Sequence, residues 1–143
     1  LIDKFSGQVS GESIIEKNQV EIKEIFEQEN IEEILNKTYS LSQNGSEFSK
    51  NTEHELKGKS PTSLKITFKQ IHMATEMSLR DALIMEYRMV QRCQASGDFY
   101  EGVRAMLVDK DRNPQWKPSN LDKVDEIWVN HFFEPLHEKD LKI

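Results

Sequence analysis

The stretch DFYEGVRAMLVDKDRNPQWKP runs from Asp98 to Pro118 and joins a helical pattern to a charged end bounded by prolines. Asp98 and Glu101 are spaced like a helix cap pair, directly after Gly97, a residue type that often ends helices. Gly102 lies inside the second helix, where glycine costs roughly 1 kcal/mol relative to alanine. We therefore predict a tight corner between two helices, with another backbone or a ligand close to Gly102.

Helical patterns flank this corner, and no run alternates cleanly enough to predict a strand. Upstream, Ser78 and Asp81 are spaced like a capping box, and the long helix behind them is expected to end at Gly97. Leu79, Leu83, Val90 and Cys93 are expected near its apolar side, with Met89 beside them, and all five methionines of the chain, Met85 and Met106 among them, are predicted to be core. Ser60 before Pro61 predicts another helix start, because the N–H that proline lacks would have no partner there.

The N-terminal third has weaker signals. Residues 1–17 contain two glycines and several serines and are predicted to be a loop. Short amphipathic helices are predicted over about 18–27 and from the capping residue Asn30. A further helix over 46–57 has few apolar residues, which is typical of an outer layer or a flexible lid.

The C-terminal part predicts one last amphipathic helix behind Ser119. Its apolar residues are Leu121, Val124, Ile127, Trp128 and Phe132. The whole chain therefore predicts a mainly α fold with five to seven helices.

Composition narrows the class of protein. The chain has 143 residues, of which 36% are hydrophobic and 31% charged, which is polar for one compact domain. The net charge of −6 disfavours the phosphate backbone of a nucleic acid. No apolar run approaches the ~20 residues that span a bilayer, so no membrane partner is predicted. The opening LIDKF has neither an initiator methionine nor a targeting pattern, so we expect a piece of a longer protein.

Metal and thiol chemistry are not predicted. Cys93 is the single cysteine, which excludes an internal disulfide and a cysteine-cluster zinc site. The four histidines show no ligand spacing with each other or with Cys93.

The quoted stretch resembles the C-terminal signature of the 3-hydroxyisobutyryl-CoA hydrolases, a branch of the enoyl-CoA hydratase/isomerase (crotonase) superfamily. Three further segments resemble the same family: KSPTSLKIT (59–67), MEYRMVQRC (85–93) and HFFEPLHEKDLKI (131–143). The run E-G-V-R-A followed by D-K-D is specific, since short crotonases carry only the looser E-G-x-x-A-F-x-x-K-R.

The resemblance covers the C-terminal part of such an enzyme. In the family, a preceding crotonase core supplies a glycine-rich oxyanion hole and catalytic carboxylates in the pattern P-E…G-x-F-P-D-x-G, and neither pattern occurs here. Thioester hydrolysis needs both an oxyanion donor and a placed acid or base. We therefore expect residues 1–17 to link to the core and 18–143 to form the C-terminal helical domain of an α/β spiral enzyme. This domain has no predicted catalytic residue and is expected to be inactive alone.

The resemblance also implies a function for the parent protein. Its reaction would be hydrolysis of 3-hydroxyisobutyryl-CoA in valine catabolism, in the mitochondrial matrix. The substrate carries coenzyme A, and no separate cofactor is implied. The helical domain would pack on the core, cover the acyl-CoA site and form a subunit interface in a homo-oligomer.

Three residues of the corner are implied to contact coenzyme A. Lys110 resembles the basic residue that reaches a CoA phosphate in crotonases, with Arg112 as a second candidate and Trp116 as a stacking partner for adenine. The residues themselves leave other interpretations open. The neighbours Asp109 and Asp111 favour a solvated lysine, and a tryptophan between prolines is typical of packing.

Two other functional classes stay open from the sequence. A non-catalytic, hydrolase-like protein of this family can be a structural component of a mitochondrial ribosome, although the net charge of −6 argues against RNA contact. A stand-alone helical interaction domain is the other class. Intact oxyanion-hole and carboxylate motifs upstream of this chain would favour the enzyme.

Overall fold

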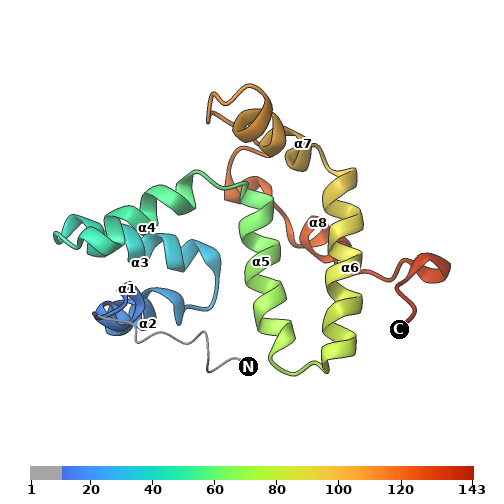
Figure 1. Ribbon diagram of the computed structural model, residues 1–143, viewed down its shortest axis with the longest axis horizontal. Helices are drawn as coiled ribbons and strands as arrows, with labels where there is room; N and C mark the ends of the chain where they lie inside the picture. The colour runs from blue at the N-terminus through green and yellow to red at the C-terminus, as the bar shows by residue number, and fades with distance from the viewer. Residues whose placement is uncertain (1–10) are drawn as a thin grey trace, which may run out of the picture.

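The computed structural model describes residues 11–143, which form helices joined by turns and irregular segments, with no strand among them (Figure 1). The N-terminal part comprises α1 (Ile14–Lys17), α2 (Gln19–Phe26), α3 (Ile31–Gln43) and α4 (Glu47–Lys57). The central part comprises α5 (Pro61–Ala74), α6 (Leu79–Ala95), α7 (Gly97–Val103) and the π-helical turn η2 (Arg104–Val108). The C-terminal part comprises η3 (Leu121–Lys123), α8 (Glu126–His131) and η4 (His137–Lys139). The predicted helical class is confirmed, and the eight α-helices of the described chain exceed the five to seven expected.

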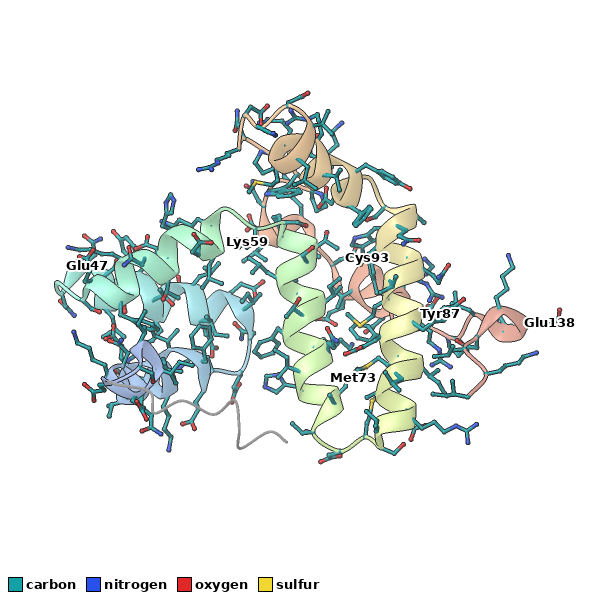
Figure 2. All side chains as sticks on the ribbon, viewed as in Figure 1. Glu47, Lys59, Met73, Tyr87, Cys93 and Glu138 are labelled. Carbon is teal, nitrogen blue, oxygen red and sulfur yellow. The ribbon has the colours of Figure 1, made fainter. Side chains whose placement is uncertain are left out.

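The main hydrophobic core lies between α5, α6 and the C-terminal segment. Helices α5 and α6 run antiparallel and side by side, and Met73 lies between them (Figures 1 and 2). The buried members of the core are Ile66, Met85, Met89, Val124, Val129 and Phe132. Phe132 is only 1% exposed, so the C-terminal segment is an integral part of this core.

A second apolar cluster joins α2, α3 and α4 to the outer side of α5. Its buried residues are Ile25, Ile31 and Ile34, with Phe48, Leu56, Leu64 and Phe68 packed against them. Helix α4 therefore has anchors despite its polar sequence, and it lies as an outer layer on α3.

The predicted helix starts are confirmed where a local cap determines them. The side-chain oxygens of Asn30, Ser60 and Ser78 accept hydrogen bonds from backbone N–H groups three residues on, at 2.8, 3.2 and 3.2 Å. Pro61 lies at the first position of α5, as expected. Such caps satisfy N–H groups that the helix cannot satisfy itself, and they involve only neighbours in sequence.

The prediction of a loop over residues 1–17 is wrong at its end, where α1 forms one helical turn. Ser13 Oγ accepts from the Glu16 N–H (3.1 Å), and Glu16 Oε2 accepts from the Ser13 N–H (2.9 Å). This reciprocal pair stabilises the turn. Residues 1–10 of the predicted loop lie outside the described residues.

The prediction for α6 is confirmed for the core methionines Met85 and Met89 and wrong for three of the four residues expected near its apolar side. Leu79, Leu83 and Val90 are 77%, 42% and 49% exposed, whereas the adjacent methionines Met85 and Met89 are buried. Apolar residues occur around much of this helix, so periodicity alone does not select the side that faces α5 and α8. Cys93 does pack against the core, as predicted.

The predicted single helix behind Ser119 is divided into η3 and α8. Val124 and Phe132 are buried as expected, whereas Ile127 is 82% exposed. Asp125 is extended and caps α8 by accepting a backbone hydrogen bond at 2.7 Å, so helix formation starts again there.

Candidate functional site

The corner between α6 and α7 is as tight as predicted, but a different residue ends the first helix. Ser96 adopts an extended backbone (φ −84°, ψ 150°), and Gly97 is already the first residue of α7. Gly97 therefore does not have the left-handed helix-ending role that its residue type suggested.

Asp98 and Glu101 are not the predicted cap pair, because each bonds to residues distant in sequence. Asp98 Oδ2 accepts from the Ser60 hydroxyl (2.6 Å), and Oδ1 accepts from the Lys117 N–H (2.9 Å). Asp98 thus connects α7 to the start of α5 and to the segment after residues 109–115, which we call the charged loop. Glu101 accepts from the Gln115 N–H at 2.6 Å.

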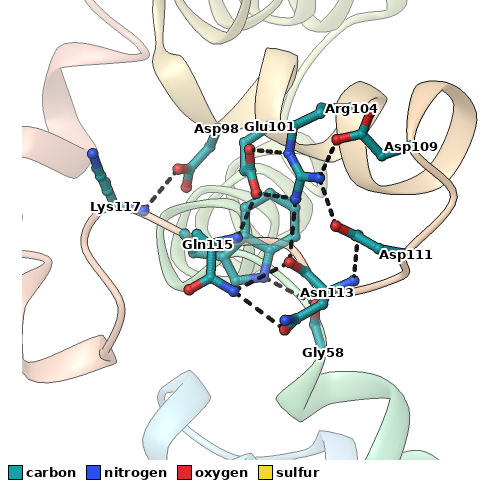
Figure 3. Close-up of polar contacts among 10 residues, drawn as sticks. Gly58, Asp98, Glu101, Arg104, Asp109, Asp111, Asn113, Gln115 and Lys117 are labelled. Atoms are coloured by element: carbon teal, nitrogen blue, oxygen red, sulfur yellow. Dashed lines mark hydrogen bonds and ion pairs between the residues drawn. The ribbon is translucent and has the colours of Figure 1, made fainter.

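A single guanidinium, that of Arg104, organises the charged loop (Figure 3). Its Nε and Nη2 donate to the two oxygens of Glu101 (2.9 and 2.8 Å). Its Nη1 donates to Asp109 (2.7 Å) and Asp111 (2.6 Å), and Nη2 also donates to the Asn113 carbonyl (3.3 Å). We call these five residues the Arg104 network. Sequence reasoning missed Arg104, although one arginine among three nearby carboxylates was a readable signal.

The network fixes the charge states of its members. Hydrogen bonds from Arg104, aided by the Gln115 N–H, lower the pKa of Glu101 to about 2. The same guanidinium lowers the pKa of Asp111, and its carboxylate partners raise the pKa of Arg104. A carboxyl with such a low pKa is ionised and weakly basic near neutral pH. The network is therefore suited to holding the loop in one conformation and to binding, and not to proton transfer.

Lys110 and Arg112 lie in this loop, and both are exposed. Their φ angles are 57° and 55°, a left-handed conformation that costs a non-glycine residue roughly 1–2 kcal/mol. The Arg112 N–H donates to the Ala105 carbonyl (3.0 Å), which ties the loop back to η2. Within residues 11–143, neither cation takes part in an ion pair, because Asp109 and Asp111 pair with Arg104 instead.

Trp116 fills the space that Gly102 leaves. A Cβ atom added at Gly102 would lie 3.3 Å from Cη2 of the Trp116 ring, a tighter contact than side chains normally make. Trp116 Nε1 donates to the Gly58 carbonyl at 3.0 Å. The close packing predicted at Gly102 is confirmed, but the neighbour is the Trp116 side chain and not the backbone or ligand that was predicted. The packing interpretation of Trp116 is supported, while stacking on adenine stays a prediction.

A groove of about 880 Å³ runs along α5 between the N-terminal helices and α7–η2. Lys59, at the start of α5, and Cys93, on α6, are labelled in Figure 2, and both line the groove. Apolar side chains dominate its wall, and four of them are 47–68% exposed: Phe99, Met106, Ile71 and Leu107. The exposure of Phe99 and Leu107 leaves them free to contact another surface, and Met106, which was predicted to be core, is exposed as well.

Metal and thiol chemistry find little support in the described chain. Among residues 11–143, no three of the His, Cys, Asp and Glu side chains are grouped closely enough to hold a metal ion. Burial raises the pKa of the Cys93 thiol, which is the opposite of what an activated nucleophile needs. None of the helices in this range is both long and apolar enough to cross a bilayer.

Comparison with known proteins places these features in a family. The sequence model of the enoyl-CoA hydratase/isomerase family matches residues 1–133. The chain is 42% identical over 132 residues to the mitochondrial 3-hydroxyisobutyryl-CoA hydrolase of Gallus gallus, covering 92% of this chain and 34% of that protein. For the Homo sapiens protein of the same name, the identity is 41% over 129 residues, covering 90% and 33%. The chain thus spans about a third of the length of these curated relatives.

Two solved structures are similar in fold. A carnitinyl-CoA dehydratase from Mycobacterium thermoresistibile superposes with a TM-score of 0.84 at 26% identity, over 94% of this chain and 38% of that one. An enoyl-CoA hydratase from Rhodobacter sphaeroides 2.4.1 superposes with a TM-score of 0.84 at 27% identity, over 96% of this chain and 40% of that one. In both cases, the helical arrangement described above corresponds to a minor part of a larger acyl-CoA enzyme.

Proposed function

The chain belongs to the enoyl-CoA hydratase/isomerase family, and we propose that it is the C-terminal helical portion of a 3-hydroxyisobutyryl-CoA hydrolase. The observation that carries this proposal is the identity of 40–43% to relatives of that name over most of this chain. The corner supports it, since Glu101 and Arg104 of E-G-V-R-A bond to each other and Arg104 bonds to both aspartates of D-K-D.

We assign the chemistry to a part of the protein that lies outside this chain. Hydrolysis of a thioester needs donors for the developing oxyanion and a placed acid or base. The sequence contains neither the glycine-rich nor the carboxylate pattern of the crotonase core. The relatives are about three times as long as the chain, which leaves room for that core. The parent enzyme would act in valine catabolism, in the mitochondrial matrix.

The helical portion would contribute surfaces and binding residues. The groove along α5 exposes apolar side chains whose burial against the core would be favourable. In that position the helices would cover the acyl-CoA site and could also form a subunit interface of a homo-oligomer. Lys110 and Arg112 would contact phosphates of coenzyme A, and Trp116 would be the candidate neighbour of the adenine.

Release of free coenzyme A from 3-hydroxyisobutyryl-CoA tests this function. We expect turnover by the intact protein, meaning this chain together with its preceding core, and none by the 143-residue chain alone. Acetyl-CoA is the control substrate and should react much more slowly. Turnover by the 143-residue chain alone would contradict the assignment of the chemistry to the preceding core. An inactive intact protein would contradict the hydrolase and favour a non-catalytic role, in a mitochondrial ribosome or as an interaction domain.

A further inference from the structure

Asp109 and Asp111 flank the exposed Lys110 in sequence, and Asp111 also precedes the exposed Arg112, yet both carboxylates bond to Arg104. We propose that Arg104 is a positioning residue that keeps Lys110 and Arg112 available for the phosphate groups of coenzyme A. This inference rests on the proposed function, which supplies the ligand. It assigns to Arg104 a role in binding although Arg104 itself need not touch the ligand.

The first step of the argument is electrostatic. Lys110 lies between Asp109 and Asp111 in sequence, and without another partner these acids would be free to pair with it in competition with a phosphate. Both acids instead point to one nitrogen of Arg104, with distances of 2.7 and 2.6 Å. Arg104 therefore occupies the carboxylates that would compete with a bound phosphate.

The second step is geometric. Lys110 and Arg112 both adopt the left-handed backbone conformation, which persists only when surrounding contacts impose it. The loop is held at three points: by the Arg104 bonds to Asp109 and Asp111, by the Arg112 N–H to Ala105, and by Arg104 Nη2 to the Asn113 carbonyl. The binding groups are thus fixed before a ligand arrives, which reduces the entropy lost on binding.

The third step concerns the residue type. Arg104 uses all three of its nitrogens, two on Glu101 and one on the aspartates, and a lysine ammonium could not reach these groups in the same fixed fork. A lysine at position 104 would keep the charge and lose the geometry. Charge and geometry can therefore be separated by substitution.

Calorimetric titration of the intact protein with coenzyme A tests the proposal. Arg104→Gln should weaken binding about tenfold, because the freed aspartates turn to the cations and remove charge-assisted bonds to phosphate. The affinity of Arg104→Lys for coenzyme A should lie between those of the wild type and Arg104→Gln. The triple variant Arg104→Gln/Asp109→Asn/Asp111→Asn should recover part of this loss, to about threefold weaker than wild type, because no competing carboxylate remains although the loop has lost its bonds to Arg104. The matched control is Arg80→Gln, which removes an exposed arginine from the start of α6 and should change nothing.

A kinetic readout separates positioning from general damage to the fold. Arg104→Gln should raise KM for 3-hydroxyisobutyryl-CoA and leave KM unchanged for the pantetheine thioester of the same acid, which has no phosphates. If Arg104→Gln fails to fold, Asp109→Asn/Asp111→Asn serves in its place and should bind coenzyme A at least as tightly as wild type.

The outcomes distinguish this inference from the proposed function. Normal hydrolysis with unchanged coenzyme A affinity in Arg104→Gln would overturn the inference and leave the function standing. Weak binding that the triple variant does not partly restore would also overturn it, as would weaker binding by Asp109→Asn/Asp111→Asn. Rescued binding in a protein without hydrolase activity would support the inference and overturn the function.

Discussion

Two regions of the molecule hold their shape by different means. The core between α5, α6 and α8 buries six apolar side chains, among them Phe132 at 1% exposure. The corner formed by α7, η2 and the charged loop buries only Ala105 in η2 and leaves Met106, Leu107 and Val108 at 55–68% exposure. Its shape depends on Arg104, Asp98 and Trp116, through bonds between polar groups and one aromatic contact.

Under the proposed function, this difference separates a part of the chain that is stable by itself from a part that the rest of the protein would cover. Buried apolar surface stabilises the core without help from outside. The corner instead combines exposed apolar residues with polar bonds that fix one loop, which is the arrangement expected of a surface that another part of the protein covers. Substitutions in the core should therefore lower stability most, those at Trp116 should lower it less, and those in the charged loop should change binding more than stability.

The largest effect is expected from Phe132→Ala. Removing a fully buried aromatic ring should lower the free energy of unfolding by about 3–5 kcal/mol. Chemical denaturation of the chain measures it. Ile127→Ala, on the exposed side of α8, is the matched control and should stay within about 0.5 kcal/mol. Similar losses from both variants would show that α8 does not complete the core.

Among changes in the corner, Trp116→Ala should lower the free energy of unfolding most, by about 2 kcal/mol. The loss is smaller than for Phe132 because the Trp116 ring is only partly buried. Trp116→Phe keeps much of the ring contact with Gly102 and loses the bond to the Gly58 carbonyl, so it should cost about 1 kcal/mol. The same denaturation assay compares the two variants. If both are neutral, the ring is not a packing element.

Gly102→Ala tests the contact from the other side. Alanine gains up to about 1 kcal/mol in helix propensity, but its Cβ would press on the Trp116 ring, so little net gain is expected. In a Trp116→Ala background, Gly102→Ala should raise the free energy of unfolding by this full amount, because the Trp116 ring is no longer in the way. Equal effects in the two backgrounds would mean that the residues are not coupled.

Lys110→Gly should separate stability from binding within one residue. Glycine accepts the positive φ of this position, so the free energy of unfolding should stay the same or rise by up to about 1 kcal/mol. Coenzyme A affinity should nevertheless fall, because the ammonium is lost. Unchanged affinity would remove Lys110 from the binding site.

The smallest effect on overall stability is expected from protonation of Glu101, since exposed ion pairs contribute little. Its pKa of about 2 in the folded protein is below the ordinary value, so its contribution is complete above about pH 5 and is lost as the pH falls towards 2. An NMR titration of the Glu101 carboxyl carbon measures the midpoint. Arg104→Gln should raise that midpoint, and Arg80→Gln should not. An ordinary midpoint in the wild type would contradict the network.

The sequence predicted features that depend on near neighbours. The caps at Asn30 and Ser60 involve residues three positions apart, and both were found. It failed where the partner is distant: Asp98 bonds to a serine 38 residues away, and that bond replaces the predicted cap. The side of α6 that faces the core was predicted only in part for a related reason: Met85 and Met89 were assigned correctly, but only the position of α5 and α8 shows that Leu79 and its neighbours on that side lie outside the core.

The candidate site was located only in part. The corner and the close contact at Gly102 followed from pattern and propensity. The left-handed conformation of Lys110 and the partner of its flanking acids did not, because no local pattern determines which way a loop carboxylate turns. The neighbours Asp109 and Asp111 argued against phosphate binding in the sequence, and Arg104 removes much of that objection in the fold.

The claim that the rest of the protein covers the corner and groove is tested most directly by amide hydrogen exchange. The 143-residue chain and the intact protein would be compared over residues 104–108 of η2 and 126–131 of α8. We predict that η2 exchanges much more slowly in the intact protein, while α8 exchanges at similar rates in both. Equal exchange of η2 in the two forms would contradict the account.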